Sequence, residues 1–149
     1  MLLPDKREQK INEICEYGEL QEFKEFVALA VDTAFLNKNS ISIYTNRNID
    51  LNIKGPTHTK DNKIILPIWN MTKGLPFLWA LFHEVGHAMD KSSITKKYDL
   101  TREEFAWDKA SELLIPFFQK HGHRELFDSR VSYCMNEYKK AIASENSKD

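Results

Sequence analysis

The twelve residues from Leu78 to Met89 place the motif H-E-x-x-H inside a strongly apolar run. On an α-helix, His83 and His87 would lie about 40° apart in projection and one turn apart along the axis. Their rings can then meet at one point, as the first two ligands of a tetrahedral Zn²⁺ must. Glu84 falls about 100° from His83 on the same arc. The opposite arc, centred about 230° from His83, carries apolar side chains: Leu78, Phe82, Val85 and Met89. The pattern predicts a buried helix with three polar groups facing one opening.

The predicted burial of these polar side chains favours a bound metal. Two imidazoles and a carboxylate buried without partners would cost several kcal/mol in total. A surface helix that carried two histidines by coincidence would show a polar face around them, and this one does not. We therefore predict that His83 and His87 bind Zn²⁺ and that Glu84 acts as a general base on water at the metal.

The rest of the chain suits a single soluble domain. Its 149 residues are enough for one sizeable core, and 42% hydrophobic with 29% charged residues is an ordinary globular composition. A net charge of −1 gives no electrostatic signature of direct nucleic-acid binding. No apolar run is long enough for a bilayer, and no early segment looks like a signal peptide. Cys15 and Cys134 have no metal-type spacing. We expect reduced thiols and a cytoplasmic protein with no membrane partner.

Hydrophobic periodicity predicts an α+β fold, mainly helical and zincin-like, with a small three-stranded sheet. Residues 5–36 read as helix with a break at Gly18, followed by a hairpin of 41–45 and 49–53. Residues 57–62 read as a polar loop and 63–69 as a third strand. Pro67 suggests that this strand is at the sheet edge or ends there. A free edge that leads to the metal helix would suit the capture of an extended peptide.

The C-terminal half should be helical. The metal helix should run from Pro76 to about Asp90, followed by a polar connection over 91–99. Thr101 looks like the N-cap of the next helix, over 102–121, with Glu104 completing a T-x-x-E capping box. Pro116 should interrupt that helix. A last amphipathic helix is expected over 124–143. Residues 1–143 then form one domain, and 144–149 a mobile polar tail.

A third metal ligand is expected from the helix that begins near Thr101. A metzincin would have glycine and histidine three and six residues after His87, where this chain has Asp90 and Ser93. Glu103 shares its helical face with apolar residues: Ala106, Ala110, Leu113, Leu114 and Phe117. A buried carboxylate needs a partner, which favours Glu103 as the ligand. Glu104 with Asp108 is the alternative, because that pair could serve as a ligand and its hydrogen-bond acceptor.

These motifs resemble a known family. The sequence H-E-V-G-H at 83–87, followed by E-E-F-A-W at 103–107 and L-L-I-P at 113–116, is similar to the gluzincin-type metallopeptidases of the ImmA/IrrE group. Their pattern is H-E-x-G-H, then E-x-x-A-N/D-x-F-A, then L-L-x-P. The resemblance covers most of residues 20–120 and puts Glu103 on the ligand glutamate. Trp107 and Lys109 depart from the pattern, so this chain would be a divergent member. The resemblance implies a protein substrate, such as a repressor.

Several roles stay open at the level of the sequence. The residue that stabilises charge on the substrate carbonyl could be His121, His123, Tyr98 or Tyr133. The run His121-Gly122-His123 could supply a metal ligand, although it looks more like a helix C-cap. Three functions are compatible with the motif: a zinc endopeptidase, a zinc-containing module that binds a regulator without cutting it, and a helical interaction protein.

Overall fold

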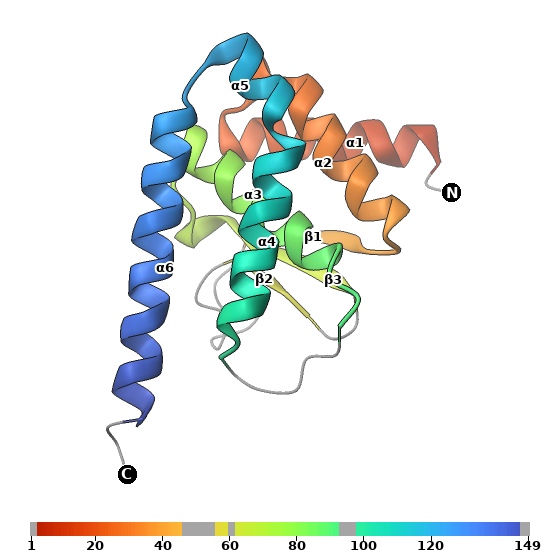
Figure 1. The fold of residues 1–149 in the computed structure, drawn as a ribbon. Coiled ribbons are helices and arrows are strands. Elements are labelled where there is room, and N and C mark those ends of the chain that lie inside the picture. Colours follow the sequence, from red (N-terminus) through yellow and green to blue (C-terminus); the bar gives the residue numbers. More distant parts are fainter. Residues whose placement is uncertain (1–2, 46–55, 60–61, 93–97, 147–149) are drawn as a thin grey trace.

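A computed structural model describes residues 3–45, 56–59, 62–92 and 98–146 of the chain. In these residues the fold is a mainly helical α+β domain, as the periodicity predicted (Figure 1). The helices are α1 (Pro4–Gly18), α2 (Lys24–Leu36), α3 (Leu75–Ala88), α4 (Leu100–Leu113), α5 (Ile115–His121) and α6 (Arg124–Asn146). The strands are β1 (Ser40–Tyr44), β2 (Thr57–His58) and β3 (Lys63–Pro67). Two short 3₁₀ turns, Gln21–Phe23 and Ile68–Asn70, precede α2 and follow β3.

The sheet has the order β1-β3-β2, with β1 parallel and β2 antiparallel to β3. The third strand is therefore central in the sheet, and of the two possibilities that Pro67 offered, an edge strand or a strand end, the second is confirmed, because β3 ends at Pro67. Ile64, Ile65 and Leu66 are all buried, and such an unbroken apolar run is typical of a strand covered on both faces. Residues 57–58 form β2, where a loop was expected. The predicted hairpin strand at 49–53 lies outside the described residues.

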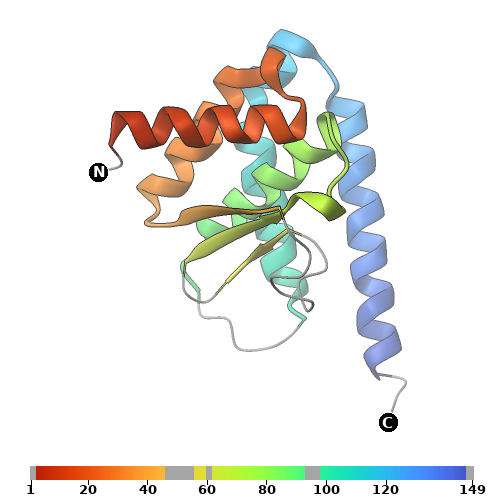
Figure 2. The same cartoon turned by 180° about the vertical axis from the view of Figure 1, so that it is seen from behind.

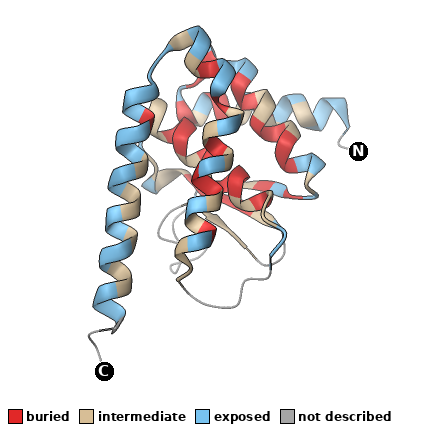
Figure 3. Ribbon diagram, viewed as in Figure 1, coloured by how far each residue is buried: buried red, intermediate tan, exposed pale blue. Residues whose placement is uncertain are grey.

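Helix α3 is at the centre of the core. Leu78, Leu81, Phe82 and Val85 have no exposed surface, and the buried residues in Figure 3 concentrate on this helix and its neighbours. It contacts α2, α4, α6, β2 and β3. Helices α1 and α2 lie above the sheet in Figure 2, joined by the break predicted at Gly18. Glu19 follows that break with a left-handed backbone, and α1 ends there.

The start of α4 differs from the expectation. Its N-cap is Asp99, whose Oδ1 accepts a hydrogen bond from the Arg102 backbone N–H at 3.3 Å. Thr101 lies inside the helix, so the predicted capping box is wrong, and Glu104 is exposed. Aspartate caps helices as well as threonine does, and the alternation of polar residues here gave no means of telling the two positions apart. The predicted interruption at Pro116 is present, because α4 ends at Leu113 and Pro116 lies in the first turn of α5.

Helix α6 runs from Arg124 to Asn146, so residues 144–146 are helical and do not belong to a tail. It begins after Gly122, which caps α5 with a positive φ of 76°. Its first turns bury Phe127, and its C-terminal half extends past the rest of the described domain (Figures 1 and 2). No described helix combines the length and the apolar character needed to cross a bilayer.

Candidate metal centre

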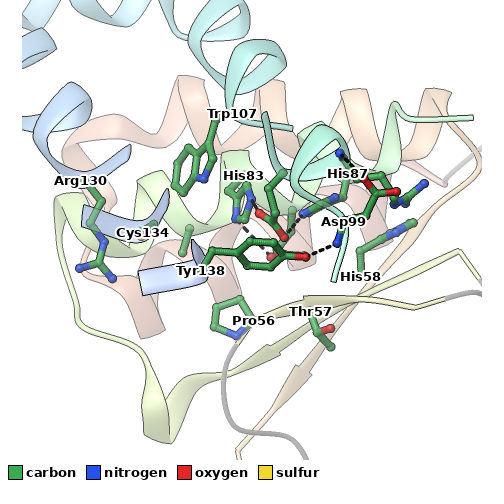
Figure 4. A pocket seen from close by; sticks show the side chains of 14 residues that line it. Pro56, Thr57, His58, His83, His87, Asp99, Trp107, Arg130, Cys134 and Tyr138 are labelled. Atoms are coloured by element: carbon green, nitrogen blue, oxygen red, sulfur yellow. Dashed lines mark hydrogen bonds and ion pairs between the residues drawn. The ribbon is translucent and has the colours of Figure 1, made fainter. Parts of the chain in front are cut away.

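Three side chains from α3 and α4 converge in one place, and Figure 4 shows two of them, His83 and His87, in the pocket. The Nε2 atom of His83 lies 2.7 Å from Oε2 of Glu103, and Nε2 of His87 lies 3.2 Å from Oε1 of the same carboxylate. The ligand atoms of the three residues are all within 4.8 Å of one another. Among the described residues, His83, His87 and Glu103 are the group of potential metal ligands whose ligand atoms lie this close together. Glu104 and Asp108, the alternative pair, are exposed on the other side of α4.

The close approach of α3 and α4 depends on Gly86. A β-carbon placed on this glycine would overlap the carbonyl oxygen of Ala106 and lie 2.9 Å from its Cα atom. Because glycine has no side chain, the backbone of α3 at Gly86, between the two histidines, can touch the backbone of α4 at Ala106. Glu103 precedes Ala106 by three residues, about one helical turn, so this contact brings its carboxylate to the histidines.

Hydrogen bonds and nearby charges shift the pKa values of Glu103 and His87. Burial alone would raise the pKa of Glu103, but hydrogen bonds from His83 and His87 outweigh it and lower this pKa to about 2. Burial acts to lower the pKa of His87, and here the hydrogen bond to Glu103, with the charges of Glu84 and Glu103, raises it. The carboxylate is thus ionised at neutral pH, as a metal ligand must be.

Glu84 is the most deeply buried carboxylate near the cluster, with 4% of its surface exposed. Its Oε1 lies 3.6 Å from Nδ1 of His83, and its Oε2 has no hydrogen-bond partner among the described residues. Burial raises the pKa of Glu84, an effect that the charges of the two histidines partly oppose. Buried carboxylate oxygens are normally paired. An unpaired one beside a metal-binding set suits a group that exchanges a proton with water held there.

Trp107 supports the ring of His83 directly. The indole and imidazole rings are parallel within 4°, and their centroids are 4.0 Å apart. Trp107 is 5% exposed and also contacts Phe127 of α6 edge to face. The sequence singled out this position because a tryptophan replaces the asparagine or aspartate of the resembling pattern. The structure shows that this tryptophan packs against a candidate ligand, so it restricts the orientation of that ligand.

His58 was not anticipated, because it lies in a stretch that looked like a polar loop. It is on β2, and its Nε2–H donates to Oδ1 of Asn39 at 2.7 Å. Its ring is parallel to that of His87 within 6°, at a centroid distance of 6.5 Å. Burial, together with the charges of His87 and Arg102, lowers the pKa of His58 to about 4. His58 is therefore neutral, and it lines the pocket on the side of the sheet.

Arg102 was also missed, because an arginine in a helical first turn is normally a surface residue. It is buried and donates from Nη1 to the backbone oxygen of Ser92 at 3.0 Å and to its Oγ at 2.7 Å. The same Nη1 lies 3.4 Å from Oδ2 of Asp90. These contacts fasten the chain that follows α3 to the start of α4. They help to hold Glu103, the next residue, in place.

The cluster opens into a pocket of about 380 Å³ that β2, α3, α4 and α6 line together. Helix α6 contributes Arg130, Cys134 and Tyr138, which are spaced four residues apart on one face. Tyr138 accepts a hydrogen bond at its hydroxyl from the backbone N–H of Asp99 at 2.6 Å. The sequence predicted an amphipathic helix here, and Cys134 and Tyr138 lie on the part of it that faces the pocket.

The other residues that the sequence offered lie elsewhere or at the margin. His121 packs on Phe23, Phe26 and Phe117, and His123 contacts the same Phe117 ring, so neither is part of the metal cluster. Tyr133 is 57% exposed on the outside of α6. Tyr98 contacts the ring of Tyr138 edge to face at 5.5 Å and is thus next to the pocket. Sequence periodicity could not show which of these residues lie at the pocket, because that depends on which helix ends are brought together in the folded protein.

Comparisons of this chain with known protein families, with curated proteins and with solved structures found no match. The fold and the site therefore define the class of the protein: an α+β domain with a candidate His-His-Glu metal centre. Two imidazole nitrogens and one carboxylate oxygen are a donor set that suits a divalent transition metal.

Proposed function

We propose that this protein is a zinc-dependent peptidase, with His83, His87 and Glu103 as the zinc ligands. The observation that carries the proposal is the buried, unpartnered Oε2 of Glu84 beside a set of three ligands. A structural zinc site would have four protein ligands and no use for such a carboxylate. A catalytic site has three ligands, an open position and a base. The resemblance of the motifs to ImmA/IrrE-type peptidases supports the same assignment.

The residues divide the chemistry between them. Bound to the two imidazoles and Glu103, zinc would supply a Lewis acid that lowers the pKa of water and polarises a carbonyl group. Glu84 takes a proton from the attacking water as the C–O bond forms, and the carbonyl π electrons move to oxygen. When the C–N bond breaks, Glu84 returns that proton to the leaving amine. Trp107 and Arg102 hold His83 and Glu103 in position for these steps.

The substrate that we propose is a specific intracellular protein, such as a regulator or repressor. Thr57 and His58 of β2 line the pocket, and among the described residues β2 pairs only with β3. Its other edge can hydrogen-bond an extended peptide backbone as a further antiparallel strand. An extended segment is also what a peptidase needs, because folded backbone cannot reach a recessed carboxylate.

A second candidate function is a zinc module that binds a regulator without cutting it. Cys134 favours it, because this thiol lines the same pocket and could act as a fourth ligand. It is not part of the group whose ligand atoms lie within 4.8 Å. A closed site of that kind would also leave Glu84 buried without a role, so the peptidase is the better-supported function.

Substitution of Glu84 separates the two functions. We expect the Glu84→Gln protein to keep one zinc per chain and to cut peptides at least about a hundredfold more slowly than wild type. The assay is mass spectrometry of a peptide mixture prepared from a bacterial proteome, incubated with each zinc-loaded protein. Glu104→Gln, an exposed neighbour of the ligand, is the matched control and should behave like wild type. Equal cleavage by wild type and Glu84→Gln would disprove the mechanism.

A further inference from the structure

Tyr138 is placed at the pocket by two contacts that fix its ring and its hydroxyl. The hydroxyl oxygen lies 2.6 Å from the backbone nitrogen of Asp99, the residue that caps α4. The ring of Tyr98 packs against the ring of Tyr138 at an interplanar angle of 79°. Figure 4 shows Tyr138 among the side chains that line the pocket, with its hydroxyl directed to Asp99, and His83 and Glu103 line the same pocket. A phenol held in this way has little freedom to turn out of the pocket.

The hydrogen bond with Asp99 determines what the hydroxyl can do. A backbone N–H is a donor, so the tyrosine oxygen is the acceptor in this contact, and the phenolic proton is left to donate elsewhere. A hydroxyl that already accepts one hydrogen bond is polarised and becomes a stronger donor. Asp99 is also at the N-terminal end of α4, where the helix dipole adds positive potential. The group is thus prepared to meet an oxygen that gains negative charge.

We propose that Tyr138 is a catalytic residue that donates a hydrogen bond to the substrate carbonyl oxygen while the peptide bond is cleaved. This inference rests on the proposed peptidase function. Water adds to the carbonyl carbon and loses its proton to Glu84, and the displaced electron pair collects on the carbonyl oxygen. Tyr138 stabilises that charge without giving up its proton. Donors placed in advance for such an oxygen are worth about 10²–10³ in kcat.

The protonation state of Tyr138 agrees with a donor role. Burial raises the pKa of its hydroxyl, and the charge of Glu103 acts in the same direction against the hydrogen bond from Asp99. The phenol therefore keeps its proton throughout the neutral range. The competing explanation is that the Tyr138 hydroxyl has only a structural role and links α6 to the start of α4. Loss of a structural contact would lower the melting temperature, whereas loss of a hydrogen-bond donor to the substrate would lower kcat.

The test compares zinc-loaded Tyr138→Phe with wild type on the peptide that wild type cuts best. We expect kcat to fall about a hundredfold, with KM within about threefold and zinc content unchanged. A phosphinic analogue of the same peptide, whose tetrahedral oxygens imitate the reacting carbonyl, should bind the variant at least about tenfold more weakly. Tyr133→Phe is the matched control, because Tyr133 is on the same helix and 57% exposed. It should match wild type in every measurement.

If removal of the hydroxyl disrupts the structure of the pocket, a second variant that keeps the hydroxyl still tests the donor role. A 3,5-difluorotyrosine at position 138 keeps the shape and the hydroxyl but ionises at a lower pH. If Tyr138 is a donor, the alkaline fall in kcat must move to lower pH in this protein, because the ionised oxygen cannot donate. An unmoved profile, or unchanged kcat and analogue binding in Tyr138→Phe, overturns the donor role and leaves the peptidase intact. A zinc-loaded wild type that cuts no peptide overturns both.

Discussion

At the scale of single residues, Glu103 and Glu104 show how one position along a helix changes the role of a carboxylate. Glu103 meets both histidines, whereas Glu104 is exposed. We predict that Glu103→Ala lowers zinc affinity by more than about a hundredfold, beyond the loss typical for a residue that only supports a ligand. Glu104→Ala should change it less than twofold. Competition with a chromophoric chelator measures both affinities. Equal losses in the two variants would remove Glu103 from the site.

The choice between these two glutamates could be made from the sequence because helical geometry is local. The apolar neighbours of Glu103 fixed its face, and that argument held although the capping residue was assigned wrongly. His58 and Tyr138 could not be found in the same way. Both residues line the pocket from elements that are distant in sequence from the metal helix. The periodicity of such an element predicts which of its residues are buried, but it does not predict which other elements they contact.

At the scale of the elements, the contact between α3 and α4 controls the site. We predict that Gly86→Ala destabilises the protein by about 3 kcal/mol, at the upper end of overpacking costs, because backbone leaves no room for the added methyl group. The same displacement should move Glu103 away from the histidines and weaken zinc binding. Urea unfolding and zinc titration measure the two effects. A variant with wild-type stability and wild-type zinc affinity would contradict this account of the helix contact.

The pairing of α1 with α2 should make stability depend on pH. Arg7 donates to both carboxylate oxygens of Asp32, at 2.7 and 2.9 Å, and this hydrogen bonding lowers the pKa of Asp32. A lowered pKa in the folded state means that the unfolded chain takes up the proton first as the pH falls. The pair therefore contributes fully above the ordinary aspartate pKa and loses its contribution as pH falls through the lowered value.

The variant Asp32→Asn isolates this effect. It should unfold at a slightly lower urea concentration than wild type at pH 7, and the difference should shrink as the pH falls below the ordinary aspartate pKa. The effect is small, because both side chains are partly exposed and water screens the pair. A difference that stays constant with pH would show that the ion pair contributes nothing through its charge.

The elements themselves were predictable to different degrees. The helices followed from their periodicity, and the break at Gly18 and the interruption at Pro116 followed from the chemistry of glycine and proline. The order of the strands did not follow. A parallel pairing of β1 with β3 requires knowledge of what covers the sheet, and the two residues of β2 are too few to show any alternation.

At the scale of the whole molecule, a bound ion should stabilise the fold, because its ligands come from two helices that must be packed to bind it. At a free zinc concentration a thousand times the dissociation constant, the gain is about 4 kcal/mol. For a chain of this length, that corresponds to a rise in melting temperature on the order of 10 °C. Differential scanning calorimetry with zinc and with a chelator measures it. His87→Ala should show no rise, and an equal rise in that variant would place the ion elsewhere.

The class of fold and the helix that carries the histidines could be predicted because they depend on composition and on one strongly patterned segment. The shape of the pocket could not, since it arises where β2, α4 and α6 meet α3.

The stacking of Trp107 on His83 has an optical consequence. An indole in van der Waals contact with an imidazole exchanges charge readily with that ring in the excited state, and a cation on the imidazole makes the exchange more favourable. Occupancy of the cluster can thus be followed by ultraviolet emission from the native chain, without a label. Trp69 and Trp79 add emission of their own, so the effect of an ion is read as a difference, and the light from one residue reports on the chemistry of its neighbour.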